Sequence, residues 1–84
     1  MKKYELTNDT ITANGKTLHR IKALKTFSNV EEGELGGYVE REDNLGQIGD
    51  ARVYGNALVC GDALVCGDAR VYGNARVYGN ALVY

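Results

Sequence analysis

The sequence predicts an all-β protein whose second half is a β-solenoid, and three observations support this fold class. Residues 49–84 are one six-residue phrase written six times: GDARVY, GNALVC, GDALVC, GDARVY, GNARVY and GNALVY. A fixed short period is typical of solenoids, in which each repeat buries its apolar side on its neighbours. Each phrase also alternates with the period of a strand, and its Gly-Asn or Gly-Asp pair suits a sharp corner.

The alternation within the phrase predicts which side chains face the interior. Ala and Val share one side of each short strand, while Arg or Leu shares the other side with Tyr or Cys. Small and β-branched residues suit a narrow, tightly packed interior. The predicted core therefore consists of Val53, Val59, Val65, Val71, Val77 and Val83.

Read from its valine, each phrase is Val-x-Gly-[Asn/Asp]-Ala-x. This pattern resembles the hexapeptide repeat of the left-handed parallel β-helix superfamily. The resemblance implies a left-handed coil of triangular cross-section, with three hexads in each turn of about eighteen residues. Six hexads then make two coils. Residues eighteen apart are expected to stack, which places Val53 on Val71, Val59 on Val77 and Val65 on Val83.

The three outer faces of such a coil differ in chemistry. One face carries Arg52, Tyr54, Arg70 and Tyr72, a second carries Leu58 and Cys60 below Arg76 and Tyr78, and the third carries Leu64, Cys66, Leu82 and Tyr84. An outward apolar patch on so small a protein is expected to be an interface. The predicted oligomer interface is Leu58, Leu64, Cys66, Leu82 and Tyr84.

Residues 1–48 are expected to form a β-rich capping module before the repeats of residues 49–84. A short strand is predicted at 4–6. Strands at 10–13 and 17–21 flank Asn14-Gly15, a strong hairpin signal. The stretch 18–24 also fits a short helix, because its apolar positions follow neither period cleanly. Residues 26–37 read as an ordered loop, 36–40 as the start of a strand, and 42–44 as a turn into the first coil.

A second resemblance covers the segment before the repeats. The stretch includes Phe27–Val30, Gly33, Gly36–Glu40, Asn44–Gln47 and Gly49-Asp50. It is similar to the N-terminal segment of YdcK-like proteins, which are bacterial and phage hexapeptide-repeat proteins that often carry an acyltransferase label. Together the two resemblances cover the chain from about residue 20 to the end. Relatives with a fuller solenoid continue for many more coils.

The residues that such enzymes use are missing from the repeats. Hexapeptide acyltransferases resemble this scaffold but use a histidine base on or near the coils, and carbonic anhydrases of this fold bind zinc through three histidines. This chain has one histidine, His19, outside the repeats. Cys60 and Cys66 lie one hexad apart, beyond disulfide reach on adjacent faces and without a zinc spacing. We therefore expect no enzyme, no cofactor, no metal and two reduced thiols.

Charge is unevenly distributed along the chain. Residues 1–25 hold six Lys or Arg and two acids, residues 26–48 hold one Arg and six acids, and the repeats hold three of each sign. A formal net charge of −1 argues against general nucleic-acid binding.

The chain contains no apolar run of membrane-spanning length and opens without a signal peptide, which predicts a cytoplasmic protein.

The leading functional hypothesis is self-assembly. Two coils bury little apolar surface, and an uncovered last coil presents unpaired backbone groups to another copy. Closed trimers and end-to-end fibres are both compatible with this.

The alternative is a module that binds a nucleotide, an acidic ligand or a host protein, because planar guanidinium groups lie beside aromatic rings. The same side chains could instead only stabilise neighbouring strands. The candidate ligand face is Arg52, Tyr54, Arg70, Tyr72, Arg76 and Tyr78.

Overall fold

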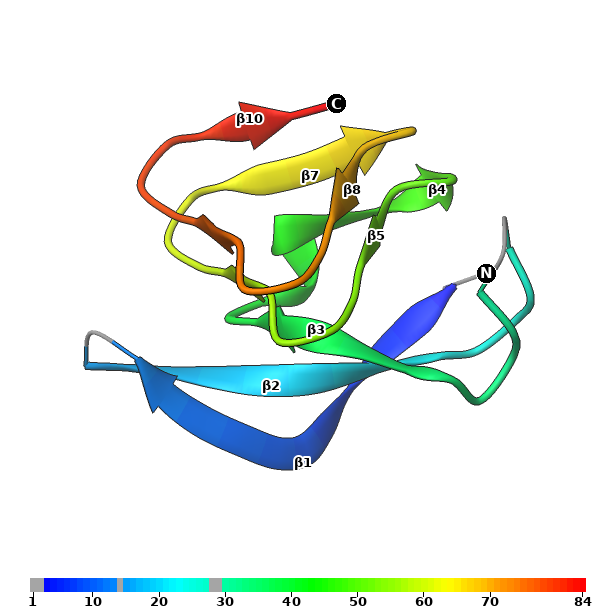
Figure 1. Ribbon diagram of the computed structural model, residues 1–84, viewed down its shortest axis with the longest axis horizontal. Helices are drawn as coiled ribbons and strands as arrows, with labels where there is room; N and C mark the ends of the chain where they lie inside the picture. Colours follow the sequence, from blue (N-terminus) through cyan, green and yellow to red (C-terminus); the bar gives the residue numbers. More distant parts are fainter. Residues whose placement is uncertain (1–2, 14, 28–29) are drawn as a thin grey trace.

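The computed structural model describes residues 3–13, 15–27 and 30–84, without the side chains of residues 47 and 48, and this part of the chain is all-β (Figure 1). The strands are β1 (Tyr4–Ala13), β2 (Lys16–Ala23), β3 (Leu35–Val39), β4 (Leu45–Gly49), β5 (Arg52–Val53), β6 (Leu58–Val59), β7 (Leu64–Gly67), β8 (Arg70–Val71), β9 (Arg76–Val77) and β10 (Leu82–Val83). One turn of 3-10 helix, η1 (Glu42–Asn44), precedes β4. The predicted all-β class is confirmed.

The first two strands form the predicted hairpin. β1 and β2 are antiparallel, and Ala13 pairs with Lys16 across a two-residue turn. Gly15 in that turn has φ +75°, a left-handed conformation that glycine adopts without strain. The other turn residue, Asn14, lies outside the described residues. The helix considered for residues 18–24 is wrong, because Lys16–Ala23 is a strand that also pairs with β3.

The strands form three sheets of mixed character. The largest has the order β1-β2-β3-β6-β9, which is antiparallel as far as β3 and parallel beyond it. The other two have the orders β10-β7-β4 and β5-β8. The repeat strands pair in parallel at a spacing of eighteen residues, as predicted: Val53 with Val71, Val59 with Val77, and Val65 with Val83. We call residues 49–66 the inner segment and residues 67–84 the outer segment.

The parallel stack begins before the repeats. β3 pairs with β6 and β4 pairs with β7, so that Val39 lies beside Val59 and Leu45 beside Val65. These partners are twenty residues apart, and the spacing becomes eighteen at Gly49 and Gly67, after a register shift within β4. Residues 35–49 therefore supply two of the three sides beneath the inner segment.

One buried core runs through the stack. It contains the alanines and valines of the repeats together with Tyr4, Ile21, Val39 and Leu45 from the first half of the chain. β3 crosses this core closely at Gly36 and Gly37. A Cβ on Gly37 would lie 2.6 Å from Cγ1 of Val53 and 2.7 Å from the carbonyl oxygen of Ala57. Glycine is therefore required here for close approach of the backbone.

Candidate interaction surfaces

One edge of the repeat strands has no strand partner among the described residues. The N–H of Leu58 donates to the carbonyl of Ala75 at 3.0 Å, and equivalent bonds join the inner and outer segments at the other two sides. Arg76 is the residue of the outer segment that corresponds to Leu58, with which it pairs. Its N–H therefore points away from the inner segment, as the N–H of Leu58 points towards the outer one. β8, β9 and β10 are each the last strand of their sheet. We call their unpaired side the open edge.

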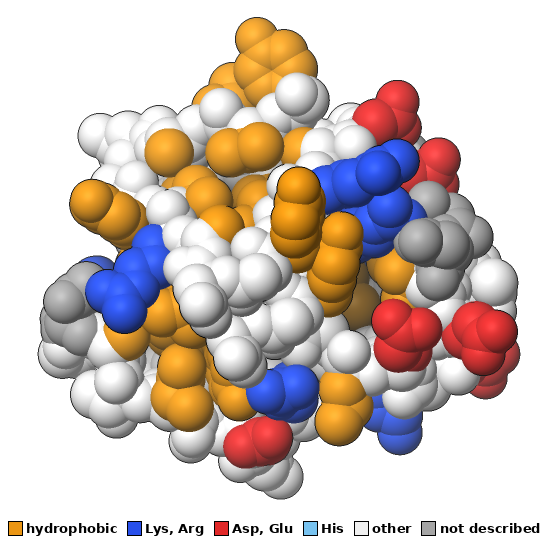
Figure 2. All heavy atoms as spheres, viewed as in Figure 1, with side chains coloured by type: hydrophobic (Ala, Val, Ile, Leu, Met, Phe, Trp, Pro, Cys, Tyr) orange, Lys and Arg blue, Asp and Glu red, His pale blue; other side chains and the backbone are white. Residues whose placement is uncertain are grey.

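The interior of the stack is also uncovered at the open edge. Ala57 and Ala63 of the inner segment are buried, whereas Ala75 and Ala81, eighteen residues later, are exposed. The valines of β9 and β10 pack against the core but stay only partly buried. Figure 2 shows hydrophobic side chains at the end of the molecule formed by β10. On the β8 side Ala69 and Val71 are buried, so the uncovered part of the core lies at β9 and β10.

The opposite end of the stack is closed by the first residues of β1. Tyr4 is 1% exposed and belongs to the core, and its hydroxyl donates to the carbonyls of Leu45 at 2.6 Å and of Glu42. Burial raises the pKa of this hydroxyl above its usual value, and the nearby carboxylates of Glu42 and Asp43 act in the same direction. Tyr4 thus fills the end of the core and satisfies the backbone where β4 begins.

Lys3 closes the side of the stack next to Tyr4. Its buried ammonium group donates to the carbonyl of Ala51 at 2.6 Å and to that of Gly49 at 3.2 Å, and lies 4.4 Å from the ring centroid of Phe27. Burial lowers the pKa of Lys3, and Asp50 partly opposes this effect. A charged donor therefore satisfies the backbone carbonyls where β4 leads into β5.

Asn44 fixes the loop between β3 and β4 to the inner segment. Its side-chain amide donates to the carbonyls of Ala63 at 2.8 Å and Gly61 at 3.2 Å, and its side-chain oxygen accepts from the N–H of Arg41 at 2.7 Å. Sequence reasoning assigned no role to Lys3, Tyr4 or Asn44. The sequence feature that could have pointed to Asn44 is its position in the stretch that is similar to YdcK-like proteins.

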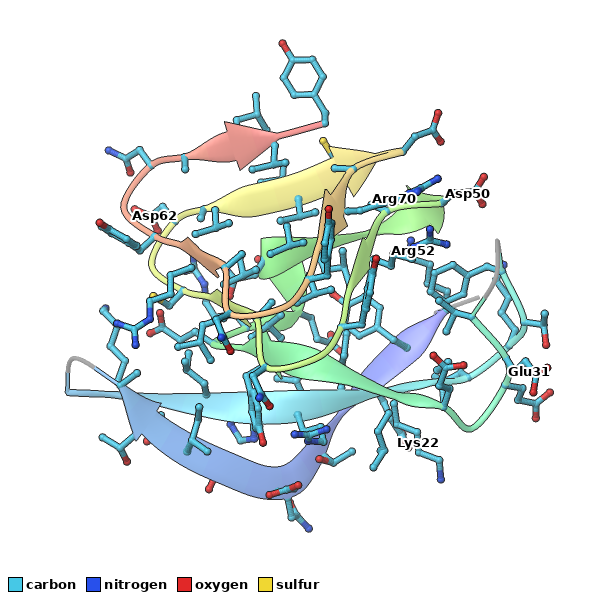
Figure 3. The ribbon with its side chains drawn as sticks, in the orientation of Figure 1. Lys22, Glu31, Asp50, Arg52, Asp62 and Arg70 are labelled. Atoms are coloured by element: carbon cyan, nitrogen blue, oxygen red, sulfur yellow. The ribbon has the colours of Figure 1, made fainter. Side chains whose placement is uncertain are left out.

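The predicted Arg and Tyr face exists, but its members differ in exposure. Tyr54 and Tyr72 are stacked, with ring centroids 5.4 Å apart and planes inclined by 12°. Arg70 lies over Arg52 in register (Figure 3). Arg52 is only 5% exposed, with its guanidinium carbon 5.7 Å from the Tyr54 ring centroid, so it is on the predicted face but covered. The accessible part of the face is Arg70 with Tyr72, which is 58% exposed.

The second face is partly covered by the hairpin. Leu58 is half-buried and packs on a cluster formed by Leu18, Tyr38 and Cys60. Leu58 is therefore partly covered, and its assignment to the oligomer interface stays a prediction. The pairing of β3 with β6 explains this, because it brings the hairpin against that side of the stack. Arg76 and Tyr78, in the outer segment, remain exposed.

The third face is apolar and accessible, as expected. We call Leu64, Cys66, Leu82 and Tyr84 the apolar flank. Leu64 and Cys66 are half-buried, whereas Leu82 and Tyr84 are exposed, Tyr84 by 82%. Both cysteines are free, and Cys60 is buried. The accessible part of this face is therefore Leu82 and Tyr84, in the outer segment.

His19 lies in β2, and its Nδ1 is 3.0 Å from the carbonyl oxygen of Thr7, so the histidine takes part in holding the hairpin. Within residues 3–13, 15–27 and 30–84, no three His, Cys, Asp or Glu side chains are grouped to hold a metal ion. In the same ranges no helix has the length and apolar character needed to cross a membrane.

Parallel strands in an eighteen-residue register, turned at corner glycines that all have positive φ, define the class of protein as a β-solenoid. Residues 51–67 and 69–84 match the family described as the YdcK beta solenoid repeat. This part of the chain is therefore a YdcK-like β-solenoid. No curated protein matches the chain.

Proposed function

We propose that this chain is a non-catalytic structural protein that associates with copies of itself. The observation that supports the proposal is the open edge, where Ala75 and Ala81 are exposed, the valines of β9 and β10 are only partly buried, and the outer side of the last strands has no strand partner among the described residues. Such strand edges pair readily with another chain. The fold proposed for residues 49–84 is a left-handed parallel β-helix. The eighteen-residue register supports its two coils, and the left hand rests on the resemblance to the hexapeptide repeat. A cytoplasmic location, supported by two free thiols, is part of the proposal.

Two surfaces are available for association: the open edge and the apolar flank. The flank carries Tyr84, which is more exposed than Tyr72 or Tyr78, and adjoins the open edge through β10. Association through either surface removes apolar area from water, which small domains need because their own core is limited.

Light scattering coupled to size-exclusion chromatography tests the proposal. The expected result is a mass above that of the 9.1-kDa chain which rises with concentration. Leu82→Ser is expected to weaken association. Leu35→Ser is the matched control, because Leu35 has nearly the same exposure, 53% against 55%, but lies on β3. A mass that stays monomeric up to about 1 mM, where even weak contacts are populated, contradicts the proposal.

A second candidate function is a binding module that uses the Arg and Tyr face. Arg70 and Tyr72 favour it, because an exposed guanidinium beside an exposed, pre-stacked ring can hold a planar anion. Titration of the labelled protein with ATP and with a polyglutamate peptide, followed by NMR, tests this. Arg70→Gln is expected to abolish the shifts, and Lys22→Gln, an exposed cation on β2, to preserve them. Shifts that survive Arg70→Gln exclude this face.

The proposal also excludes acyl transfer. The single histidine is engaged with the backbone of β1 and lies outside the repeats. Incubation of the purified chain with acetyl-CoA and simple amine or alcohol acceptors is expected to leave both unchanged. Transfer of the acetyl group above the rate of a His19→Gln variant would contradict this part of the proposal.

A further inference from the structure

The hairpin and the second face of the stack do not close completely on each other. Strands β1, β2, β3, β6 and β9 form one sheet, whose hairpin runs below the repeats (Figure 1). Residues of its first and last strands line two hollows of about 330 and 230 Å³, which share Leu58 and Arg76. We call the two hollows the side groove, and its walls include Ile11, Ala13, Leu58, Cys60, Arg76 and Tyr78. We propose that the side groove binds a small molecule that has one carboxylate and an apolar tail.

The side groove has the size of a small-ligand site and lies on the side of the stack. Small-molecule sites in proteins commonly have volumes of roughly 300–1,000 Å³, and the two hollows fall at the lower end of that range. A further coil of the repeat would stack on β9 and would leave β1, β3 and β6 in place. The hairpin wall and the floor of the groove are therefore independent of any layer that follows β9.

The floor of the side groove is apolar. Ile11 and Ala13 of β1 and Leu58 of β6 are only partly buried, and they pack on the smaller of the two hydrophobic clusters. Cys60 occupies the position of the six-residue phrase that Tyr54 occupies on the first face, and its smaller side chain leaves the hollow open. An apolar tail lying in the groove would remove these partly exposed side chains from water, which favours binding.

Arg76 places a cation beside this apolar floor. Its side chain is exposed, lines both hollows and forms no ion pair with the residues that the structure describes. Asn56 and Asn74 line the larger hollow, and their amide groups are further donors. No described Asp or Glu lines either hollow. Because a guanidinium donates two parallel hydrogen bonds to a carboxylate, the groove is complementary to a single acid group.

The register of the repeats creates this combination on one side of the stack. Leu58 pairs with Arg76 on the second side, so an apolar and a cationic side chain lie next to each other there. On the first side arginine pairs with arginine, and on the third side leucine pairs with leucine. The hairpin also lies against the second side, which makes that side the best match for a ligand that is both apolar and acidic.

Acidic side chains of the neighbouring loops have partners of their own. Glu40 accepts from the N–H of Gly61 at 2.7 Å and lies 3.7 Å from the ammonium group of Lys16. Asp62 lies 2.9 Å from the guanidinium group of Arg41. These pairs leave the guanidinium of the side groove to a carboxylate from outside the chain.

Titration of the isotope-labelled protein with sodium octanoate, followed by NMR, tests the inference. The amide signals of residues 11–13, 58–60 and 76–78 are expected to shift, with a dissociation constant of about 1 mM for so small a ligand. Octanol keeps the chain without the acid, and acetate keeps the acid without the chain. Each is expected to bind at least about tenfold more weakly than octanoate, because it makes only part of the contact.

Variants separate the two parts of the site. Arg76→Gln is expected to weaken octanoate binding about tenfold, because the charge-assisted hydrogen bonds are lost. Arg70→Gln is the matched control, because it removes an exposed cation at the same position of the phrase on the first face. Ala13→Leu narrows the apolar part of the groove and is also expected to weaken binding. Thr17→Leu, at an exposed position on β2, is its control, and circular dichroism checks the fold of all four variants.

Octanoate binding that is unchanged in Arg76→Gln, or that octanol equals, would overturn the inference. So would shifts confined to Leu82 and Tyr84 of the apolar flank, or the absence of shifts up to about 10 mM octanoate. None of these outcomes bears on self-association, which is measured as a mass without octanoate. A protein that stays monomeric would in turn leave the side groove and its ligand unaffected.

Discussion

The hydroxyl of Tyr4 donates a 2.6 Å hydrogen bond to the backbone carbonyl of Leu45, forty-one residues further along the chain. This bond joins the first strand to the lowest layer of the solenoid at a point where the ring is fully buried. The closed end of the molecule thus depends on a contact between residues that are distant in sequence.

Replacing this tyrosine should destabilise the protein without creating a cavity. Tyr4→Phe keeps the ring but leaves the carbonyls of Leu45 and Glu42 without the hydroxyl, and an unsatisfied buried acceptor costs about 1–3 kcal/mol. Urea unfolding measures the loss. Tyr78→Phe, at an exposed ring, is the control and should change the free energy of unfolding by less than about 0.5 kcal/mol. Equal losses in the two variants would show that the buried hydroxyl does not support the fold.

The same hydroxyl predicts a loss of stability in alkali. Its pKa is raised in the folded protein, so the unfolded chain releases this proton at lower pH than the folded chain does. The stabilisation is fully present below about pH 10, the usual tyrosine value, and is lost as the pH rises towards the folded value. Lys3 acts oppositely: its pKa is lowered, so its contribution improves as the pH rises towards 10.5.

The two effects are separated by comparing variants. The difference in unfolding free energy between the wild type and Tyr4→Phe, measured by urea unfolding between pH 8 and pH 11, should shrink above about pH 10. Lys3 contributes equally to both proteins and cancels. A difference that stays constant across this range would contradict the pKa assignment.

Replacing Asn44 with aspartate, which has nearly the same shape, should destabilise the protein. Asn44→Asp replaces the amide that donates to Ala63 and Gly61 with a carboxylate oxygen, which faces two carbonyl oxygens. We expect a loss of at least about 2 kcal/mol near neutral pH, because both a buried charge and two unsatisfied acceptors result. Burial raises the pKa of the new carboxyl group above its usual value, so the loss should become smaller as the pH falls towards about 4 and the group is protonated.

Thermal unfolding at several pH values measures this effect. Asn74→Asp, at an exposed corner, is the control and should be nearly neutral. If the two variants lose the same stability, the hydrogen bonds of Asn44 are not what holds the loop.

The crossing of β3 over the core predicts a strong glycine requirement. Gly37→Ala introduces a Cβ that would overlap Val53 and the carbonyl of Ala57, and overpacking of this kind costs about 1–3 kcal/mol. Gly73→Ala meets no atom within 4 Å, so it bears only the strain of its positive φ, about 1 kcal/mol. Chemical denaturation should therefore rank Gly37→Ala as the more damaging change, and the reverse order would contradict the close approach.

The sequence allowed good prediction of everything that repeats. The pairing of Val53 with Val71 follows from a period of six and three sides to a turn, and the hairpin follows from Asn14-Gly15. Contacts that occur outside the repeats were not predictable, because no periodic sequence pattern indicates them. The burial of Arg52 depends on where residues of the first half lie, and the twenty-residue spacing of Val39 and Val59 depends on the loop that holds η1. The roles of Lys3 and Tyr4 likewise depend on a fold that brings residue 4 to residue 45.

The constant register of the repeats has a consequence for how such chains change length. Because Leu58 meets Arg76 through the same backbone bonds that any further layer would use, a duplication of eighteen residues would add one layer, about 4.8 Å tall, without new kinds of contact. Insertions whose length is not a multiple of six would break the phase of the inward valines. Evolution, or a designer, can therefore extend this tube in whole layers while the closed end stays unaltered.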